Sequence, residues 1–135
     1  MKMKFLNRLW KDTKGATAVE FGMVAVLFLL MIFGTIELGR IFWVYNTMQS
    51  ALEQTARYYI TNTATSDAAL QTYAQGKMTA MKLDGSLLTV TVTKTTSLSI
   101  KFIQFDGTYA YSPLLTIIPQ FSGLHFTSKT RISYP

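Results

Sequence analysis

The sequence has no cysteine, a single histidine and only 15% charged residues. Without cysteine, a disulfide framework, a thiolate metal site and a cysteine nucleophile are all excluded. The histidine, His125, sits between Leu124 and Phe126 in a predicted strand, where we expect it to face outward. The sequence also contains no P-loop, GxGxxG or HExxH motif. We therefore predict no enzyme, no catalytic residue, no metal, no cofactor and no small-molecule substrate.

A charge content this low is well below the quarter that is usual for soluble domains, so apolar residues must be concentrated somewhere in the chain. The net charge of +6 is also concentrated. Residues 15–135 carry eight basic and six acidic side chains, which leaves most of the excess to the first fourteen residues. Basic residues interleaved with aromatics on a strand face, as single-strand binding needs, are missing. We predict no nucleic-acid partner.

The apolar concentration is one run, residues 16–36, which holds a single charged residue, Glu20. As a helix this run would be about 31 Å long, which matches the bilayer core of about 30 Å. Basic residues crowd its N-terminal end, whereas Glu37 and Arg40 balance each other at the other end. The positive-inside rule then predicts a cytoplasmic N-terminus, with the chain after about Arg40 across the membrane.

A cleaved secretory signal peptide is the ordinary alternative to a membrane span. Its apolar region is about 7 to 15 residues long and ends at a small-residue cleavage site. Here the run is longer and continues without interruption into an amphipathic pattern. We therefore favour the span.

Past the run, apolar residues keep the three- and four-residue spacing of a helix up to about residue 60. The predicted inward residues are Leu38, Ile41, Phe42, Tyr45, Met48, Leu52, Ala56 and Tyr59. A second helix is predicted over residues 67–82, capped by Ser66 or Asp67 and ended by Asp84-Gly85. Its inward face is predicted to hold Leu70, Tyr73, Ala74, Met78 and Met81.

Three strands follow by their alternating pattern. The first covers residues 88–93, and the second begins at Leu98 with Ile100 and Phe102 inward. The apolar phase slips after Phe102, which predicts a bulge or burial on both faces. Asp106-Gly107 is predicted to be a turn, and residues 109–121 an extended crossing loop. The last strand is residues 123–134, with Leu124, Phe126 and Ile132 in phase. The fold class is α+β: a long N-terminal helix, a short second helix and a small antiparallel sheet.

The residues at the start of the apolar run form a specific motif, Lys14-Gly15-Ala16-Thr17-Ala18-Val19-Glu20-Phe21. A basic leader ends in glycine, and a glutamate follows five residues later inside an apolar helix. This resembles the processing site of type IV pilin precursors, which a prepilin peptidase cuts after the glycine. The Glu20-Phe21 pair resembles the branch that builds tight-adherence (Tad) pili.

The resemblance extends through residues 13–60, which look like the N-terminal segment of TadE-like pseudopilins. Ile36-Glu37-Leu38-Gly39-Arg40 and Ala56-Arg57 carry it further along the helix. Tyr109, Tyr111, Pro113 and Leu114 match a Tyr-x-Tyr-x-Pro-Leu tendency of that family. TadF-like and TadG-like proteins share the N-terminal pattern, and the length of 135 residues favours the TadE-like group over the usually longer TadG-like one.

The resemblance implies a pilin-like fold and a role for several residues of the helix. Cleavage between Gly15 and Ala16 would free an ammonium, and Glu20, with Phe21 beside it, would pair with such an amine of a neighbouring subunit during assembly. The alternative is that Glu20 is an ordinary acid at the membrane interface, solvated by water or by lipid headgroups. Ala18, Gly22 and Ala25 form a candidate helix-packing face, although small residues at this spacing are at least as well explained by chance. The candidate anchors at the outer membrane interface are Glu37, Arg40, Trp43 and Tyr45.

Two functions are consistent with these residues. The favoured one is a minor pseudopilin of the bacterial inner membrane, with a leader in residues 1–15, a helix in 16–60 and a periplasmic head in 61–135. Its partners would be prepilin peptidase, other pilins, Tad inner-membrane assembly proteins and the lipid bilayer. The alternative is an uncleaved, membrane-anchored periplasmic binding module. Cleavage at Gly15 distinguishes them.

Overall fold

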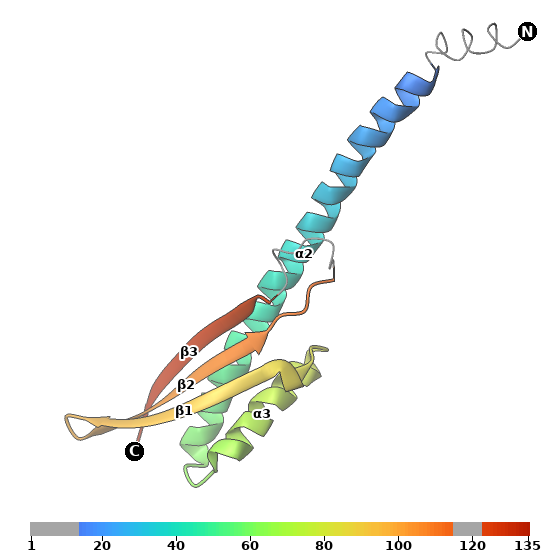
Figure 1. The fold of residues 1–135 in the computed structure, drawn as a ribbon. Coiled ribbons are helices and arrows are strands. Elements are labelled where there is room, and N and C mark those ends of the chain that lie inside the picture. Colours follow the sequence, from blue (N-terminus) through green and yellow to red (C-terminus); the bar gives the residue numbers. More distant parts are fainter. Residues whose placement is uncertain (1–13, 115–122) are drawn as a thin grey trace, which may run out of the picture. The chain divides into compact units, whose positions relative to one another are not determined.

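The computed structural model describes residues 14–114 and 123–135 (Figure 1). The predicted leader therefore lies almost entirely outside the described residues. The described chain divides into two compact units, the first ending at Leu38 and the second running from Gly39 to Pro135. The elements are the helices α2 (Lys14–Thr61) and α3 (Asp67–Ala80), the 3-10 turn η1 (Gly85–Leu87), and the strands β1 (Leu88–Ser97), β2 (Ile100–Ala110) and β3 (His125–Tyr134). They confirm the predicted α+β class.

The first unit is the N-terminal half of α2, and its surface is apolar and exposed. Phe21 and Met31, for example, are 74% and 73% exposed. By length and composition this helix can cross a membrane, and none of its most apolar window is buried within the protein. The structure thus confirms the predicted long apolar helix, and such a surface is suited to lipid or to neighbouring helices.

The second half of α2 presents a narrow buried stripe to the core of the second unit. Met48 and Leu52 are fully buried, as predicted. Three other residues were predicted inward and are exposed: Leu38 by 52%, Phe42 by 66% and Tyr45 by 38%. The stripe instead passes through Val44, because the buried face of the helix is rotated away from Phe42. Its buried residues are Val44, Thr47, Met48, Ala51, Leu52, Thr55, Ala56 and Tyr59.

Helix α3 begins at its predicted cap. The Ser66 hydroxyl oxygen accepts a hydrogen bond from the Ala69 N–H at 3.3 Å, which satisfies a backbone donor of the first turn. Leu70, Ala74 and Met78, spaced four residues apart, form its buried face. The prediction that Met81 is inward is wrong, since it caps the helix and is 53% exposed.

The segment after α3 differs from the prediction that Asp84-Gly85 ends the helix. The helix ends earlier, at Ala80, and Asp84 instead caps η1 by accepting hydrogen bonds from the N–H and the hydroxyl of Ser86. Gly85 packs directly against the backbone carbonyl of Gln75, where a side chain would not fit. Asp84-Gly85 therefore joins α3 to the sheet.

The three strands form an antiparallel sheet in the order β1-β2-β3. Leu88 pairs with Tyr109 at one end of the first ladder and Ser97 with Ile100 at the other. Both α3 and the second half of α2 lie on the same side of the sheet in Figure 1. The buried sheet residues on this side complete the hydrophobic core. They are Leu88, Val90, Ile103, Phe105 and Tyr109.

The β1–β2 hairpin contradicts two predictions. Asp106-Gly107 is not a turn but lies in the middle of β2, paired with Thr91 and Val90. The actual turn is Leu98-Ser99, where both residues adopt a left-handed backbone with φ of 49° and 66°. A two-residue type I′ turn requires this conformation at both positions. The second strand therefore begins after Ser99 instead of at Leu98, and it continues through Asp106-Gly107 to Ala110.

The burial phase of β2 also differs from the prediction. Ile100 is 50% exposed and Leu98 94% exposed, whereas Ile103 is fully buried. Pairing with β1 is one-to-one through Phe102 and Ile103, two positions where a bulge was predicted. The second predicted option, apolar burial on both faces, holds: half-buried Phe102 lies on the outer face under Arg131, whose guanidinium carbon is 4.2 Å from the ring centroid.

The chain leaves the sheet after Ala110 and returns for β3. Of the predicted crossing loop, Tyr109 and Ala110 belong to β2, residues 111–114 are irregular, and the remainder lies outside the described residues. Strand β3 confirms the last predicted strand, with Phe126 and Ile132 packed on the core. His125 is exposed, as predicted.

Candidate functional site

The predicted processing site lies in the first turn of α2. Gly15 and Ala16 are exposed, and among the described residues a Cβ atom on Gly15 would meet nothing within 4 Å. The glycine is helical here, because α2 already begins at Lys14. A peptidase that cuts an extended chain would have to unwind this first turn, which is the part of a helix that opens most easily.

The predicted assembly pair follows in the second turn. Glu20 and Phe21 are both exposed, and Phe21 is 74% exposed. Glu20 is the seventh residue of α2, so it lies beyond the first turn, to which the favourable effect of the helix dipole on a carboxylate is confined. Both side chains are thus accessible to a neighbouring molecule.

The predicted helix-packing face is a strip of small residues on α2. Ala18, Gly22 and Ala25 are four and three residues apart, so they lie on the same side of the helix. Ala18 and Gly22 are exposed and Ala25 is half-exposed. A Cβ atom on Gly22 would meet nothing within 4 Å in the described part of the chain. The strip is open to another helix.

The four predicted anchors at the outer interface differ in their surroundings. Trp43 is 58% exposed, and Tyr45 is 38% exposed with its ring edge-to-face against Phe126 at 6.4 Å between centroids. Glu37 is buried, with 1% of its surface exposed. Arg40 is half-buried and lines a cavity that sequence reasoning did not predict.

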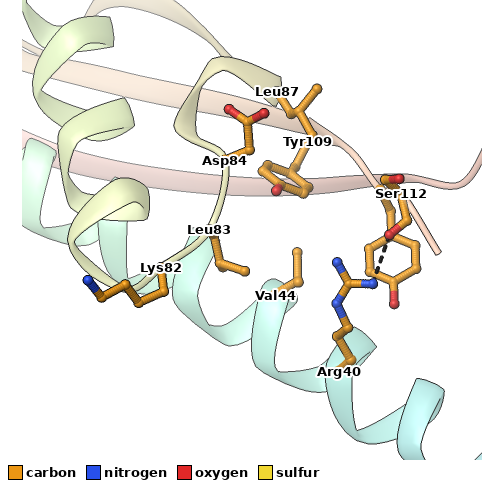
Figure 2. A pocket seen from close by; sticks show the side chains of 9 residues that line it. Arg40, Val44, Lys82, Leu83, Asp84, Leu87, Tyr109 and Ser112 are labelled. Atoms are coloured by element: carbon orange, nitrogen blue, oxygen red, sulfur yellow. Dashed lines mark hydrogen bonds between the residues drawn. The ribbon is translucent and has the colours of Figure 1, made fainter. Parts of the chain in front are cut away.

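This cavity, the Arg40 pocket, has a volume of about 400 Å³ and lies wholly within the second unit (Figure 2). Its walls come from three parts of the chain: α2, the segment that joins α3 to the sheet, and the end of β2. They are Arg40, Val44, Lys82, Leu83, Asp84, Leu87, Tyr109, Tyr111 and Ser112. The pocket therefore exists only in the folded head.

The Arg40 side chain crosses from α2 to the residues that follow β2. Its Nη1 donates a hydrogen bond to the Ser112 carbonyl oxygen at 3.0 Å, drawn in Figure 2, and its guanidinium carbon is 5.4 Å from the centroid of the Tyr111 ring. The N–H of Tyr111 in turn donates to the Leu124 carbonyl at 2.9 Å. These contacts fix the position of the guanidinium in the pocket.

Two further groups set the electrostatics of the Arg40 pocket. Burial raises the pKa of Tyr109, as does the nearby charge of Asp84, while the positive charge of Arg40 opposes both. Tyr109 is therefore a neutral hydroxyl at physiological pH. Hydrogen bonds from Ser86 lower the pKa of Asp84, so its carboxylate stays charged and directed at Ser86.

No cluster of three or more histidine, cysteine or acidic side chains that could hold a metal ion occurs in residues 14–114 and 123–135. The central groups of the Arg40 pocket are instead one fixed guanidinium and two phenols, those of Tyr109 and Tyr111, with Lys82 and Asp84 also in the lining. A guanidinium in such a setting recognises carboxylates and phosphates.

Residues 15–57 match the family model described as TadE-like protein. Over this segment the chain is similar to TadE-like proteins. The TadE-like segment begins at Gly15 and ends at Arg57, which includes every helix residue for which the sequence predicted a role. It confirms the predicted resemblance for α2, while the match of Tyr109, Tyr111, Pro113 and Leu114 to the family's loop stays a prediction. Comparison with curated proteins and with solved structures found no significant match.

Proposed function

We propose that this TadE-like chain is a minor pseudopilin that takes part in the assembly of a tight-adherence pilus. In this role a prepilin peptidase cuts the precursor after Gly15. The apolar half of α2 then holds the subunit in the inner membrane, with the head on the periplasmic side. The observation that carries the proposal is that the TadE-like segment begins at Gly15 and continues into an apolar helix that the protein itself leaves uncovered.

The exposed apolar surface supports helix–helix packing as the means of assembly. Leaving so much apolar area in water would be costly, at about 25 cal/mol for each Å². In a bilayer the same surface is matched by lipid and can be exchanged for contacts with other pilin helices. The small-residue strip of Ala18, Gly22 and Ala25 would let such a helix approach closely.

Glu20 would fix the register of that packing. A carboxylate in a spanning helix costs roughly 2.5–3.5 kcal/mol at the bilayer centre and less near its edge. Pairing with the ammonium that cleavage creates at Ala16 of a neighbouring subunit would offset this cost. Because the carboxylate is exposed in the single chain, it is available for an intermolecular pair.

Processing is tested by measuring the mass of the mature protein from cells that contain the peptidase. We expect an N-terminus at Ala16, and we expect Gly15→Leu to leave the precursor intact. Gly22→Leu is the matched control, since it puts the same side chain at another exposed glycine of α2 and should be processed normally. An intact leader in functional wild-type protein would exclude the proposal.

Assembly is tested separately by the recovery of the subunit with the pilus machinery. Glu20→Ala and the isosteric Glu20→Gln should both lose recovery, whereas Glu53→Ala, at another exposed acid of α2, should retain it. Normal recovery of the Glu20 variants would remove the pairing step but not the processing step.

The Arg40 pocket supports testing the alternative function, in which the chain is an uncleaved, membrane-anchored binding module. A binding module would keep its leader and its activity would reside in the head. If Gly15→Leu protein stays uncleaved and fully functional, this second function replaces the first.

A further inference from the structure

We propose that the Arg40 pocket binds the phosphate headgroup of an anionic phospholipid, such as phosphatidylglycerol, in the leaflet on the side of the head. The inference rests on the membrane anchoring in the proposed function and adds to it a specific lipid ligand. Three observations carry it: the depth of Arg40, the chemistry of the pocket, and the exposed Trp43 one helical turn after Arg40.

The depth follows from the geometry of α2. The predicted span ends at Ile36, and Arg40 follows four residues later in the same uninterrupted helix. Four residues rise about 6 Å along a helix axis. The headgroup layer adds roughly 5–7 Å to each side of the hydrocarbon core. The guanidinium of Arg40 is thus placed at the depth of the lipid phosphates.

The chemistry follows from how Arg40 is held. A guanidinium has five N–H donors, and the bond to Ser112 uses one of them. Contact with the Tyr111 ring orients its plane. A prepositioned guanidinium loses little entropy when it forms two parallel bonds to phosphate oxygens, which is the geometry that arginine favours. The neutral Tyr109 hydroxyl lines the same cavity and can donate a further bond.

The charged groups in and next to the pocket carry both signs. Arg40, Lys82 and Asp84 line it, with the Asp84 carboxylate directed at Ser86, and the buried Glu37 lies one helical turn before Arg40 on the same side of α2. In Figure 2 the Lys82 amine points away from Arg40, so Lys82 adds to the positive field at the rim without converging on the same point. Arg40 is therefore the group that should decide binding.

An exposed aromatic residue of α2 supplies the apolar part of a lipid site. Trp43 lies three residues after Arg40, on the same side of the helix, and is 58% exposed. Such rings are enriched at the level of the glycerol and headgroups. A ligand that carries both a phosphate and an apolar body matches this combination better than an acidic peptide or a free phosphate does.

The test places the full chain in nanodiscs of phosphatidylcholine and phosphatidylglycerol in equal amounts and counts retained lipids by native mass spectrometry. We expect wild-type protein to retain one phosphatidylglycerol about tenfold more often than phosphatidylcholine. Arg40→Gln should abolish this preference, and Arg40→Lys should restore only part of it because the bidentate bond is lost. Lys82→Gln, which removes the same charge from the rim, is the control and should keep most of the preference.

Each outcome has one meaning. Equal retention of the two lipids by wild-type protein, or an unchanged preference in Arg40→Gln, would overturn the proposal. Displacement of the lipid by millimolar glycerol phosphate would identify a soluble-phosphate site and likewise overturn it. A chain that fails to enter nanodiscs would instead contradict the membrane anchoring of the proposed function, so the two failures are distinguishable.

Discussion

Gly107 lies against Leu52, so closely that a Cβ atom on the glycine would be 2.7 Å from Cδ1 of the leucine. Gly107 is central in β2 and Leu52 is fully buried in α2. The absence of a side chain at this one position lets the helix settle onto the sheet. It also explains why a glycine, which usually weakens a strand, stands in the middle of the longest strand of the head.

Replacing Gly107 with alanine should destabilise the head by about 1–3 kcal/mol, because the Leu52 side chain would have to shift within the packed core. Urea unfolding of the detergent-solubilised full chain measures the loss. Gly76→Ala is the matched control, since Gly76 is exposed in α3 and nothing described lies within 4 Å of a Cβ atom there. That change should stabilise by about 0.5–1 kcal/mol. Equal effects of the two substitutions would contradict the close packing.

Replacing Leu98-Ser99 with Asn-Gly should stabilise the hairpin by about 1 kcal/mol or more. A left-handed backbone costs an ordinary residue about 1–2 kcal/mol, and asparagine and glycine adopt it readily. Because Leu98 is 94% exposed, its removal forfeits little packing. The midpoint of urea unfolding should rise. A fall in stability would mean that the hairpin does not turn at these residues.

The head should lose stability as pH rises above about 10, the ordinary pKa of tyrosine. Burial raises the pKa of Tyr59 and of Tyr109, so each folded ring resists ionisation that the unfolded chain permits. The hydrogen bond to Asp67 at 3.1 Å raises the pKa of Lys94, whose contribution is also present at lower pH and lost at high pH. The three effects therefore have the same sign.

The contribution of Tyr109 to the alkaline loss of stability can be measured separately. Unfolding free energies measured between pH 7 and pH 11 should fall less steeply for Tyr109→Phe than for the wild-type chain. An unchanged slope in Tyr109→Phe would show that the Tyr109 ring ionises as easily in the folded head as in the unfolded chain.

Ser66→Ala should cost about 1 kcal/mol, because the first turn of α3 loses the oxygen that accepts from the Ala69 N–H. Ser66→Asp keeps an acceptor at the same position and should restore the stability. If alanine were tolerated as well as aspartate, the cap would contribute nothing.

The helices were predictable because their signals are local. A 3.6-residue period and a serine cap placed α2 and α3 to within two residues of their ends. The two ends of β2 were not, because Asp106-Gly107 carries the usual turn signal but lies within the strand, while Leu98-Ser99 forms the turn and carries no such signal. What overrides the local signal is tertiary: Gly107 is required opposite Leu52, and Ile103 and Phe105 must share a face with Tyr109. Sequence periodicity alone does not contain those contacts.

The same distinction applies to the candidate sites. Gly15 and Glu20 form a motif within six residues, so a short window of sequence contains it whole. The Arg40 pocket joins α2 to residues about 40 and 70 positions later, and the hydrogen bond from Arg40 to Ser112 spans 72 residues. Arg40 and Tyr111 each drew attention in the sequence, but only the fold brings them together.

The Leu98-Ser99 turn is a suitable labelling site for following this subunit in cells. It is opposite the Arg40 end of the same sheet, about ten residues or 30 Å along β1. An epitope or a small dye placed there would be far from the guanidinium and, unlike one fused to residue 1, would survive removal of a leader. Antibody labelling at that position in intact and permeabilised cells would then report directly on which compartment holds the head.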